Sequence, residues 1–397
     1  MISLSDTLIG YAPIVDRKRN AIATRASVLV PGSREATIGR LYEQVAAASP
    51  ADAPAVLLAV DDLQLTDEIL RVDPVENLWI EVPSQFLVEP GGEALAVEMH
   101  RRGFRMVLAG RPIGELTPAL LPAFRMTMIH VDTDRRLKDP SSQHDPQAAR
   151  RTIPYAQLGV GSIALMERCF ATGAVAVVGW PFEDTFRHSK SVASNPDFST
   201  VARLLQLVDK GADVADMEAL IRRDPSLAYR LLRYINSAAF GLTVQVQSFR
   251  HAVMMLGYAK LKRWLTLLLA TSCKESNLRP VMFASFRRGL FLEHLIAQGQ
   301  DESVRDELFI LGVFSFLDKL FSEPLETLLA QLSVPESVTD ALVARAGPYA
   351  PYVRIAELVE QGPSLHLPDE LLGALLSTEQ CNRAVMQALL TPDLLAG

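Results

Sequence analysis

A small set of charged side chains in the first half of the chain has the types and positions needed for phosphate or metal chemistry. Glu81 lies in a short apolar run, Arg25 and Arg111 each lie two residues from one, and His130 and Asp132 end another run. Carboxylates bind divalent cations through oxygen, and arginine can hold phosphate oxygens in pairs. These five residues define a candidate ligand-binding site. The competing interpretation is that the arginines lie on loops and are solvated.

The apolar runs that carry these residues predict strands. Helical patterns at residues 34–48 and 93–102 separate several of the runs. Alternating strands and helices predict βα units with a parallel sheet, and about eight strands suffice for a closed barrel. Ligands bind such barrels at the carboxyl ends of the strands, where Arg25, Arg111 and His130 are expected. The predicted strands are Ile9–Val15, Ser27–Val30, Ala55–Val60, Leu78–Val82, Arg105–Ala109, Met126–Val131, Ile153–Val160 and Ala174–Val178.

The sequence pattern changes after Pro181. Residues 183–196 are polar and predict a linker, and almost every segment from Asp197 onward has helical periodicity. The chain is also too long for one ordinary core. We therefore predict a domain of strands and helices at residues 1–182 and an all-helical domain at residues 197–397.

Composition argues against several functions. The 397 residues carry a net charge of −7, so a large basic face for DNA is not expected. No apolar run is long enough to span a membrane, and the first residues lack the pattern of a signal peptide, which predicts a cytoplasmic protein. Cys169, Cys273 and Cys381 follow no ligand spacing and are expected to be buried free thiols.

The second half resembles HDOD domains, which are helical modules related to HD phosphohydrolases. The resemblance rests on the stretches Arg223–Gly241 and Phe249–Gly257, and it extends from about residue 197 to about residue 362. We expect the signature residues to be structural, since aspartate before proline can cap a helix and an Asn-Ser pair can bond backbone at a helix end. These signature residues are Asp224, Pro225, Asn236, Ser237 and Gly257.

The first half resembles EAL domains, the (β/α) barrels that hydrolyse cyclic di-GMP. The segments that carry the resemblance are Tyr11–Asp16 and Gly179–Phe182. Hydrolysis in this family is metal-assisted and needs several carboxylates. The resemblance implies that Glu81 is kept, whereas Ala26 replaces the glutamate of the naming triplet and Ala59 replaces a strand asparagine.

The remaining EAL motifs are also changed. Two aspartates are absent from residues 109–112, His130 replaces a lysine beside the retained Asp132, and two glutamates are absent from residues 157–162. In the second half, Ser315 and Phe316 stand where HD hydrolases carry the metal-binding His-Asp pair. The resemblance therefore implies a degenerate TIM-like EAL barrel followed by an HDOD domain, with no metal, no cofactor and no catalysis in either.

Two enzyme-like domains without metal ligands predict a non-enzymatic bacterial signalling scaffold of the EAL–HDOD type. It would act through protein contacts, mainly of the HDOD domain, in the control of motility, biofilm formation or virulence. The alternative is a receptor that binds cyclic di-GMP weakly, without hydrolysis, and relays binding from the barrel to the HDOD domain. The sequence leaves open the identity of the partner and whether the protein forms homo-oligomers.

Overall fold

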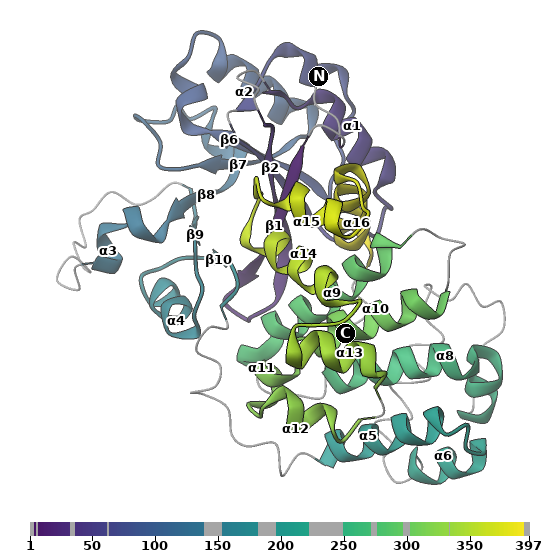
Figure 1. Cartoon of the computed structure of the whole chain (residues 1–397). Helices are drawn as coiled ribbons and strands as arrows, with labels where there is room; N and C mark the ends of the chain where they lie inside the picture. Colours follow the sequence, from purple (N-terminus) through teal and green to yellow (C-terminus); the bar gives the residue numbers. More distant parts are fainter. Residues whose placement is uncertain are drawn as a thin grey trace. The chain divides into compact units, whose positions relative to one another are not determined.

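A computed structural model describes Leu4 and residues 7–31, 36–61, 63–138, 153–181, 196–221, 249–270, 276–296, 302–332 and 334–392. The chain divides into two compact units (Figure 1). The first comprises Met1–Arg187, Glu275–Ala284 and Arg354–Pro392, and the second comprises His188–Lys274, Ser285–Val353 and Asp393–Gly397. These units do not follow the predicted sequence boundaries of 1–182, 183–196 and 197–397, which remain a prediction.

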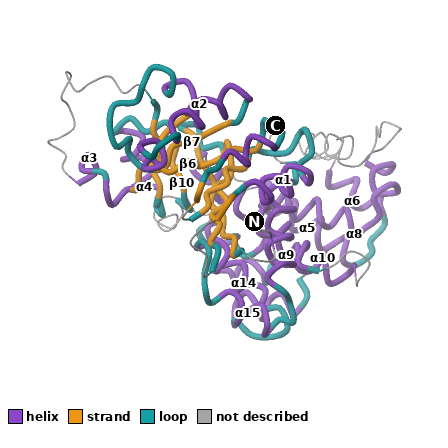
Figure 2. Tube along the Cα trace, turned by 90° about the horizontal axis from the view of Figure 1, so that it is seen from above, coloured by secondary structure: helices purple, strands orange, loops and turns teal. Residues whose placement is uncertain are grey.

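Eight strands close into a barrel in the first unit, so the predicted barrel is confirmed (Figure 2). The order around the barrel is β1-β10-β9-β8-β7-β6-β4-β2. Each strand overlaps one of the eight apolar runs that predicted it. The strands are β1 Leu8–Asp16, β2 Ala21–Leu29, β4 Val56–Val60, β6 Leu78–Pro83, β7 Arg105–Ala109, β8 Phe124–His130, β9 Tyr155–Leu158 and β10 Ala176–Val178.

Strand β1 departs from the predicted parallel sheet, because it pairs antiparallel with both β2 and β10. A tight turn causes this reversal: the Asp16 amide donates to the Asn20 carbonyl at 2.9 Å, and Arg19 adopts a φ of 68°. A turn this short joins antiparallel strands, whereas a parallel pair needs a crossover of a dozen or more residues. The first two strands therefore form a hairpin with no helix between them.

The crossovers place helices α1 Gly39–Ala48, α2 Gly92–Arg102, α3 Arg135–Lys138 and α4 Ile163–Ala171 outside the barrel. The connections also hold short 3₁₀ helices, which are η2 Asp67–Arg71, η3 Ser84–Val88, η4 Leu121–Ala123 and η5 Val131–Thr133. Two short strands, β3 Ala36–Thr37 and β5 Leu63–Gln64, form a separate parallel pair.

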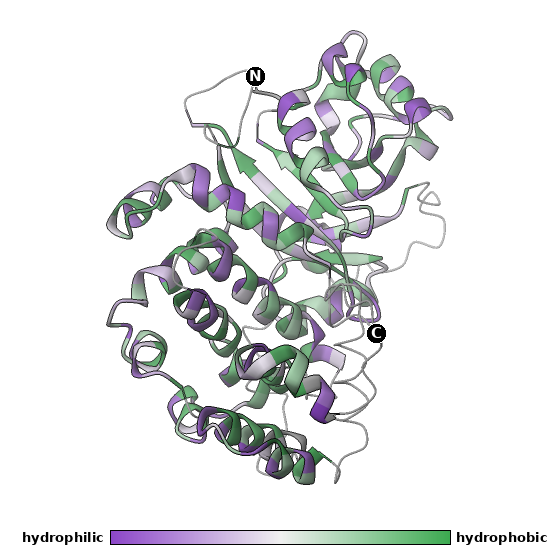
Figure 3. Ribbon diagram, turned by 90° about the vertical axis from the view of Figure 1, so that its right-hand side faces the viewer, coloured by the Kyte–Doolittle hydropathy of each residue, from purple (hydrophilic) through white to green (hydrophobic). Residues whose placement is uncertain are grey.

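The barrel interior is apolar over much of its length. One cluster joins Ile14, Ala23, Leu57, Trp79 and Val107, which come from successive or neighbouring strands. The strands are largely in the hydrophobic colour in Figure 3. Since side chains alternate between the two faces of a strand, this cluster fixes which residues of each strand face inward.

The described residues from Pro196 onward are largely helical, as predicted. In helix α8, Phe249–Ala270, Gly257 adopts a φ of 71° and a ψ of 171°, which interrupts the helical backbone. Asp224, Pro225, Asn236 and Ser237 lie outside the described residues. The other α-helices are α5 Pro196–Asp209, α6 Val214–Ile221, α9 Arg279–Leu295, α10 Glu302–Phe314, α11 Leu317–Phe321, α12 Leu325–Leu329, α13 Glu336–Thr339, α14 Ala350–Gln361, α15 Leu367–Gly373 and α16 Thr378–Leu390.

Two glycines allow helices α9 and α10 to pack in direct backbone contact. A Cβ added to Gly312 would lie 2.6 Å from both the amide nitrogen and the Cα of Gly289. We expect Gly312→Ala to lower the free energy of unfolding by about 1–3 kcal/mol, since two helix backbones must separate. Gly373→Ala, which meets nothing within 4 Å, should be neutral or stabilising. Denaturant titration of both variants checks this, and an equal effect of the two would contradict it.

Among the described residues, no helix is long and apolar enough to cross a membrane.

Candidate functional site

The one metal-ligand carboxylate expected to survive in the barrel, Glu81, is bound by an arginine. Arg25 Nε lies 2.6 Å from Glu81 Oε2, and Nη2 lies 3.1 Å from Oε1, which makes the contact bidentate. Arg25 Nη1 also donates to Ser27 Oγ at 2.6 Å. The two charged side chains are largely buried, with exposed fractions of 16% and 8%. The structure therefore brings these two predicted site residues together.

The electrostatics of this pair favour a permanent charge on the arginine. Burial by itself lowers the pKa of Arg25, but attraction to the Glu81 carboxylate outweighs it and the pKa lies above its ordinary value. The Asp61 carboxylate adds a smaller attraction of the same sign. A fixed cation thus neutralises Glu81 where a metal ion would have to bind it.

The register of β2 corrects the residue assigned to the lost glutamate. Ala23 belongs to the interior cluster, and Arg25 and Ser27 lie on the same face as Ala23, so Ala26 faces the outside of the barrel. Ala26 therefore cannot mark a ligand position inside the barrel. The inward position next to it is held by Arg25. A shift of one residue reverses the face of every side chain, which is why sequence matching alone misplaced it.

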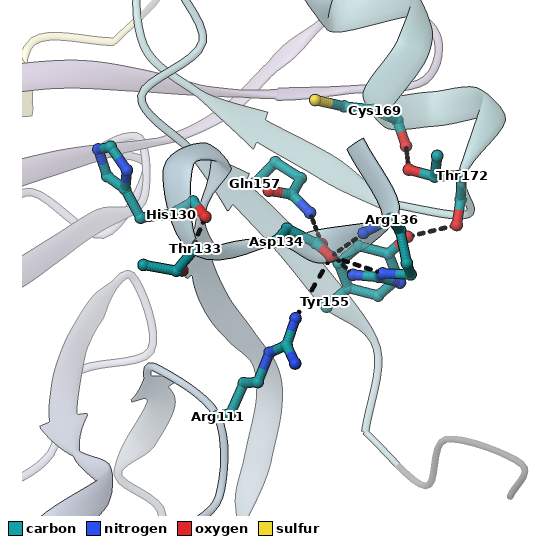
Figure 4. Close-up of polar contacts among 9 residues, drawn as sticks. All are labelled: Arg111, His130, Thr133, Asp134, Arg136, Tyr155, Gln157, Cys169 and Thr172. Carbon is teal, nitrogen blue, oxygen red and sulfur yellow. Dashed lines mark hydrogen bonds and ion pairs between the residues drawn. The ribbon is translucent and has the colours of Figure 1, made fainter. Parts of the chain in front are cut away.

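Arg111 joins a different set of residues, the Asp134 cluster, made of Asp134, Arg111, Arg136 and Gln157 (Figure 4). Asp134 is fully buried and accepts hydrogen bonds from Arg136 Nε at 2.8 Å, from Arg136 Nη2 and from Gln157 Nε2. Arg111 Nη2 reaches it at 3.3 Å, although half of the Arg111 side chain is exposed. Gln157 alternates with the interior residue Ala156, so this cluster lies on the outer face of β9.

Asp134 is charged in its buried position. Burial raises its pKa, but hydrogen bonds from Arg136 and Gln157 and the charge of Arg136 outweigh burial, so the pKa lies below its ordinary value. Arg136 also stacks over the ring of Tyr155, with its guanidinium carbon 4.2 Å from the centroid. Asp134 is not among the predicted site residues. The adjacent arginine Arg136 was the signal that could have indicated a buried pair.

His130 and Asp132 form a separate, more exposed pair at the end of β8. His130 Nδ1 lies 3.3 Å from Asp132 Oδ2, and the two side chains are 43% and 82% exposed. Figure 4 shows the His130 side chain pointing away from Asp134. Gly159 lies against the imidazole, since a Cβ there would be 2.7 Å from Nε2. The five predicted site residues thus fall into three groups with separate described contacts.

This donor set does not suit the two-metal chemistry that an EAL barrel implies. In the described part of the chain, no three His, Cys, Asp or Glu side chains gather as a set that could hold a metal ion. Glu81 is paired with Arg25, Asp134 is enclosed by arginines, and Asp132 is exposed. Divalent cations of this kind require several oxygen ligands. No hydrolytic step can therefore be derived for these residues.

An arginine also contacts the two residues that stand at the position of the HD pair in the second half. Arg288 Nη1 donates to Ser315 Oγ at 2.8 Å, and its guanidinium carbon lies 4.0 Å from the centroid of the Phe316 ring. Ser315 Oγ in turn donates to the Gly312 carbonyl at 2.6 Å. A hydroxyl and an aromatic ring that hold a guanidinium offer no anionic ligand for a metal.

Part of the helical half matches a known family. Residues 196–323 match the family model of the HDOD domain. This part of the chain is an HDOD domain. Together with the closed barrel and the relatives below, the match confirms the resemblance to EAL–HDOD proteins that the sequence indicated.

Two curated bacterial proteins are similar to part of the chain. The cyclic di-GMP phosphodiesterase CdgJ of Vibrio cholerae is 30% identical over 149 residues, which cover 38% of this chain and 34% of CdgJ. The uncharacterized protein YuxH of Bacillus subtilis is 25% identical over 187 residues, which cover 45% of this chain and 46% of YuxH. The matches therefore span between a third and a half of these relatives.

Solved structures give a weaker likeness. A standalone EAL protein of Vibrio cholerae in its c-di-GMP bound form is 16% identical, with a TM-score of 0.31 and coverage of 44% of this chain and 90% of that protein. At this TM-score the likeness supports no conclusion about ligands.

Proposed function

We propose that this chain is a non-enzymatic regulator in cyclic di-GMP signalling that acts through protein contacts. The observation that carries the proposal is the bidentate pair of Arg25 with Glu81. Metal-assisted cleavage of a phosphodiester needs carboxylates that hold cations, which activate water and neutralise charge on the phosphate. Here the remaining carboxylate holds a guanidinium, which cannot activate water.

The kinship with CdgJ supports the signalling system in this proposal. The name of CdgJ describes a cyclic di-GMP phosphodiesterase, and that activity is attributed here to CdgJ alone. In this barrel Glu81 is paired with Arg25 and Asp134 is buried among arginines, which supports a regulator without hydrolysis. The HDOD domain, in which Ser315 and Phe316 stand at the position of the HD pair, is the part of the chain that we propose binds partner proteins.

The direct test is an assay of cyclic di-GMP turnover by the full chain in the presence of Mg²⁺ or Mn²⁺. We expect no more product than in a protein-free control, and the same trace level for Glu81→Gln. Product that increases with protein concentration and disappears in Glu81→Gln would overturn the proposal.

A receptor for cyclic di-GMP is the second candidate, and Arg111 is the observation that favours it. Half of its side chain is exposed, and its described partner, Asp134, lies at 3.3 Å, so part of the guanidinium remains available to an anion. Arginine recognises phosphate in a bidentate manner. Calorimetric titration with cyclic di-GMP would show saturable binding if the barrel is a receptor.

Variants of single arginines test which residues would bind cyclic di-GMP. Arg111→Ala should weaken cyclic di-GMP binding by at least about tenfold, the effect of losing one charged hydrogen-bond donor. Arg101→Ala, an exposed arginine on α2, should not change it. Binding that survives both Arg111→Ala and Arg25→Ala would exclude this pocket, and no heat with the unaltered chain would favour the scaffold.

A further inference from the structure

The hairpin at the start of the barrel creates a packing problem. In a (β/α) barrel each crossover lays a helix over the outer face of the sheet, but the β1–β2 turn supplies none. Ala12 and Ile14 belong to the interior cluster, so Ile9 and Tyr11 face outward. They are nevertheless only 1% and 2% exposed. Another part of the chain must cover them.

Helix α16 supplies one part of this cover through a buried asparagine. Asn382 is fully buried, and its Nδ2 donates to the carbonyls of Thr7 at 2.6 Å and Leu4 at 2.8 Å. Its Oδ1 accepts from the amide of Ile9 at 3.2 Å. One side chain thus satisfies both donor and acceptor groups of the backbone that leads into β1. Losing it would leave these buried groups without partners, which is costly.

The end of helix α14 supplies the second part. The Glu360 carbonyl accepts from Trp180 Nε1 at 2.8 Å, and Trp180 packs edge-on against Tyr11 with ring centroids 5.6 Å apart. Gly362 follows, and a Cβ added to Gly10 would lie 2.4 Å from the Gly362 Cα. The backbones of Gly10 and Gly362 are in direct contact, so no residue with a side chain fits at position 10 of β1.

We propose that residues 354–392 are the fixed outer layer of strand β1, and that most of the HDOD-bearing unit is an insertion between two pieces of one folding unit. The division into compact units supports this, because Arg354–Pro392 groups with Met1–Arg187 and with the short segment Glu275–Ala284. The C-terminal helices therefore stabilise the barrel, and a protein cut after residue 353 loses the cover of β1. This inference is independent of the proposed function.

Hydrogen exchange of the full chain, followed by mass spectrometry, tests the proposal. Asn382→Ala should speed exchange in peptides covering Leu8–Asp16 by about tenfold or more, because it removes buried hydrogen bonds to this strand. Peptides of α10 should be unchanged. Arg383→Ala is the matched control, since that neighbour on the same helix is 61% exposed. Unchanged exchange of β1, or faster exchange confined to α10, would overturn the proposal.

A reciprocal variant carries the test if Asn382→Ala fails to fold. Gly10→Ala adds a methyl group on β1 against the Gly362 backbone and should speed exchange in peptides at the end of α14, more than 300 positions away in the sequence. Gly39→Ala, where an added Cβ meets nothing within 4 Å, should leave these peptides unchanged. Equal effects of the two glycine variants on these peptides, or no effect of Gly10→Ala, would contradict the proposed cover.

Discussion

Replacing Arg25 with methionine should lower the free energy of unfolding by about 3–5 kcal/mol, the cost of leaving a buried charge without its partner. The Glu81 side chain is only 8% exposed, so water cannot replace the guanidinium that pairs with it at 2.6 Å. Methionine keeps most of the volume of the arginine stem, which separates loss of charge from loss of packing. Denaturant titration near neutral pH measures the change.

The variant Glu81→Gln shows whether the unpaired carboxylate causes the loss of stability in Arg25→Met. If the penalty comes from the unpaired carboxylate, the double variant Arg25→Met with Glu81→Gln should recover much of the lost stability. The exposed pair of Arg101 with Glu98 is the matched control, and Arg101→Met should have no measurable effect. A loss for Arg25→Met that is the same with and without Glu81→Gln would show that packing, and not the ion pair, is responsible.

Replacing Asp134 with asparagine should cost about 2–4 kcal/mol near neutral pH, because the buried arginine contacts lose their counter-charge. The cost should depend on pH. The pKa of Asp134 is below its ordinary value in the folded protein, so its charged form stabilises the fold above the unfolded pKa of about 4. That contribution is lost as the pH falls through the folded pKa. The difference between the unaltered chain and Asp134→Asn should therefore shrink in acid.

Urea titrations at falling pH values measure this difference. The series ends at the lowest pH at which both proteins still fold. Asp132→Asn serves as the control, since the Asp132 side chain is 82% exposed and its replacement should have a small effect. A stability difference for Asp134→Asn that stays constant down to the lowest pH would contradict a depressed pKa in a buried ion pair.

Local sequence patterns predicted most of the barrel strands because burial on both faces makes them continuous apolar runs. Strand β7 matches its predicted range of Arg105–Ala109 residue for residue. The antiparallel direction of β1 was missed, since it follows from a turn at Asp16–Asn20 that the apolar pattern does not record. The role of residues 354–392 was missed for a related reason: helical periodicity predicts a helix but not the surface it covers.

The candidate site was predicted in part. Arg25 and Glu81 were both selected, but their pairing depends on the register of β2, β4 and β6, which no single strand encodes. Arg111 was selected as a residue of the same pocket, yet its partner Asp134 lies with Gln157 on the outer face of β9. The identities of the charged residues could be read from the sequence, whereas their grouping required the alternation of the closed barrel.

In this barrel the Arg25 guanidinium holds the Glu81 carboxylate, to which a catalytic cation would have to bind. Titration of the full chain with Mn²⁺, followed by electron paramagnetic resonance of the free ion, tests it directly, with and without cyclic di-GMP. We predict that Mn²⁺ at concentrations near that of the protein remains free, and that Glu81→Gln gives the same spectrum. A saturable, stoichiometric Mn²⁺ site that is lost in Glu81→Gln would contradict the account.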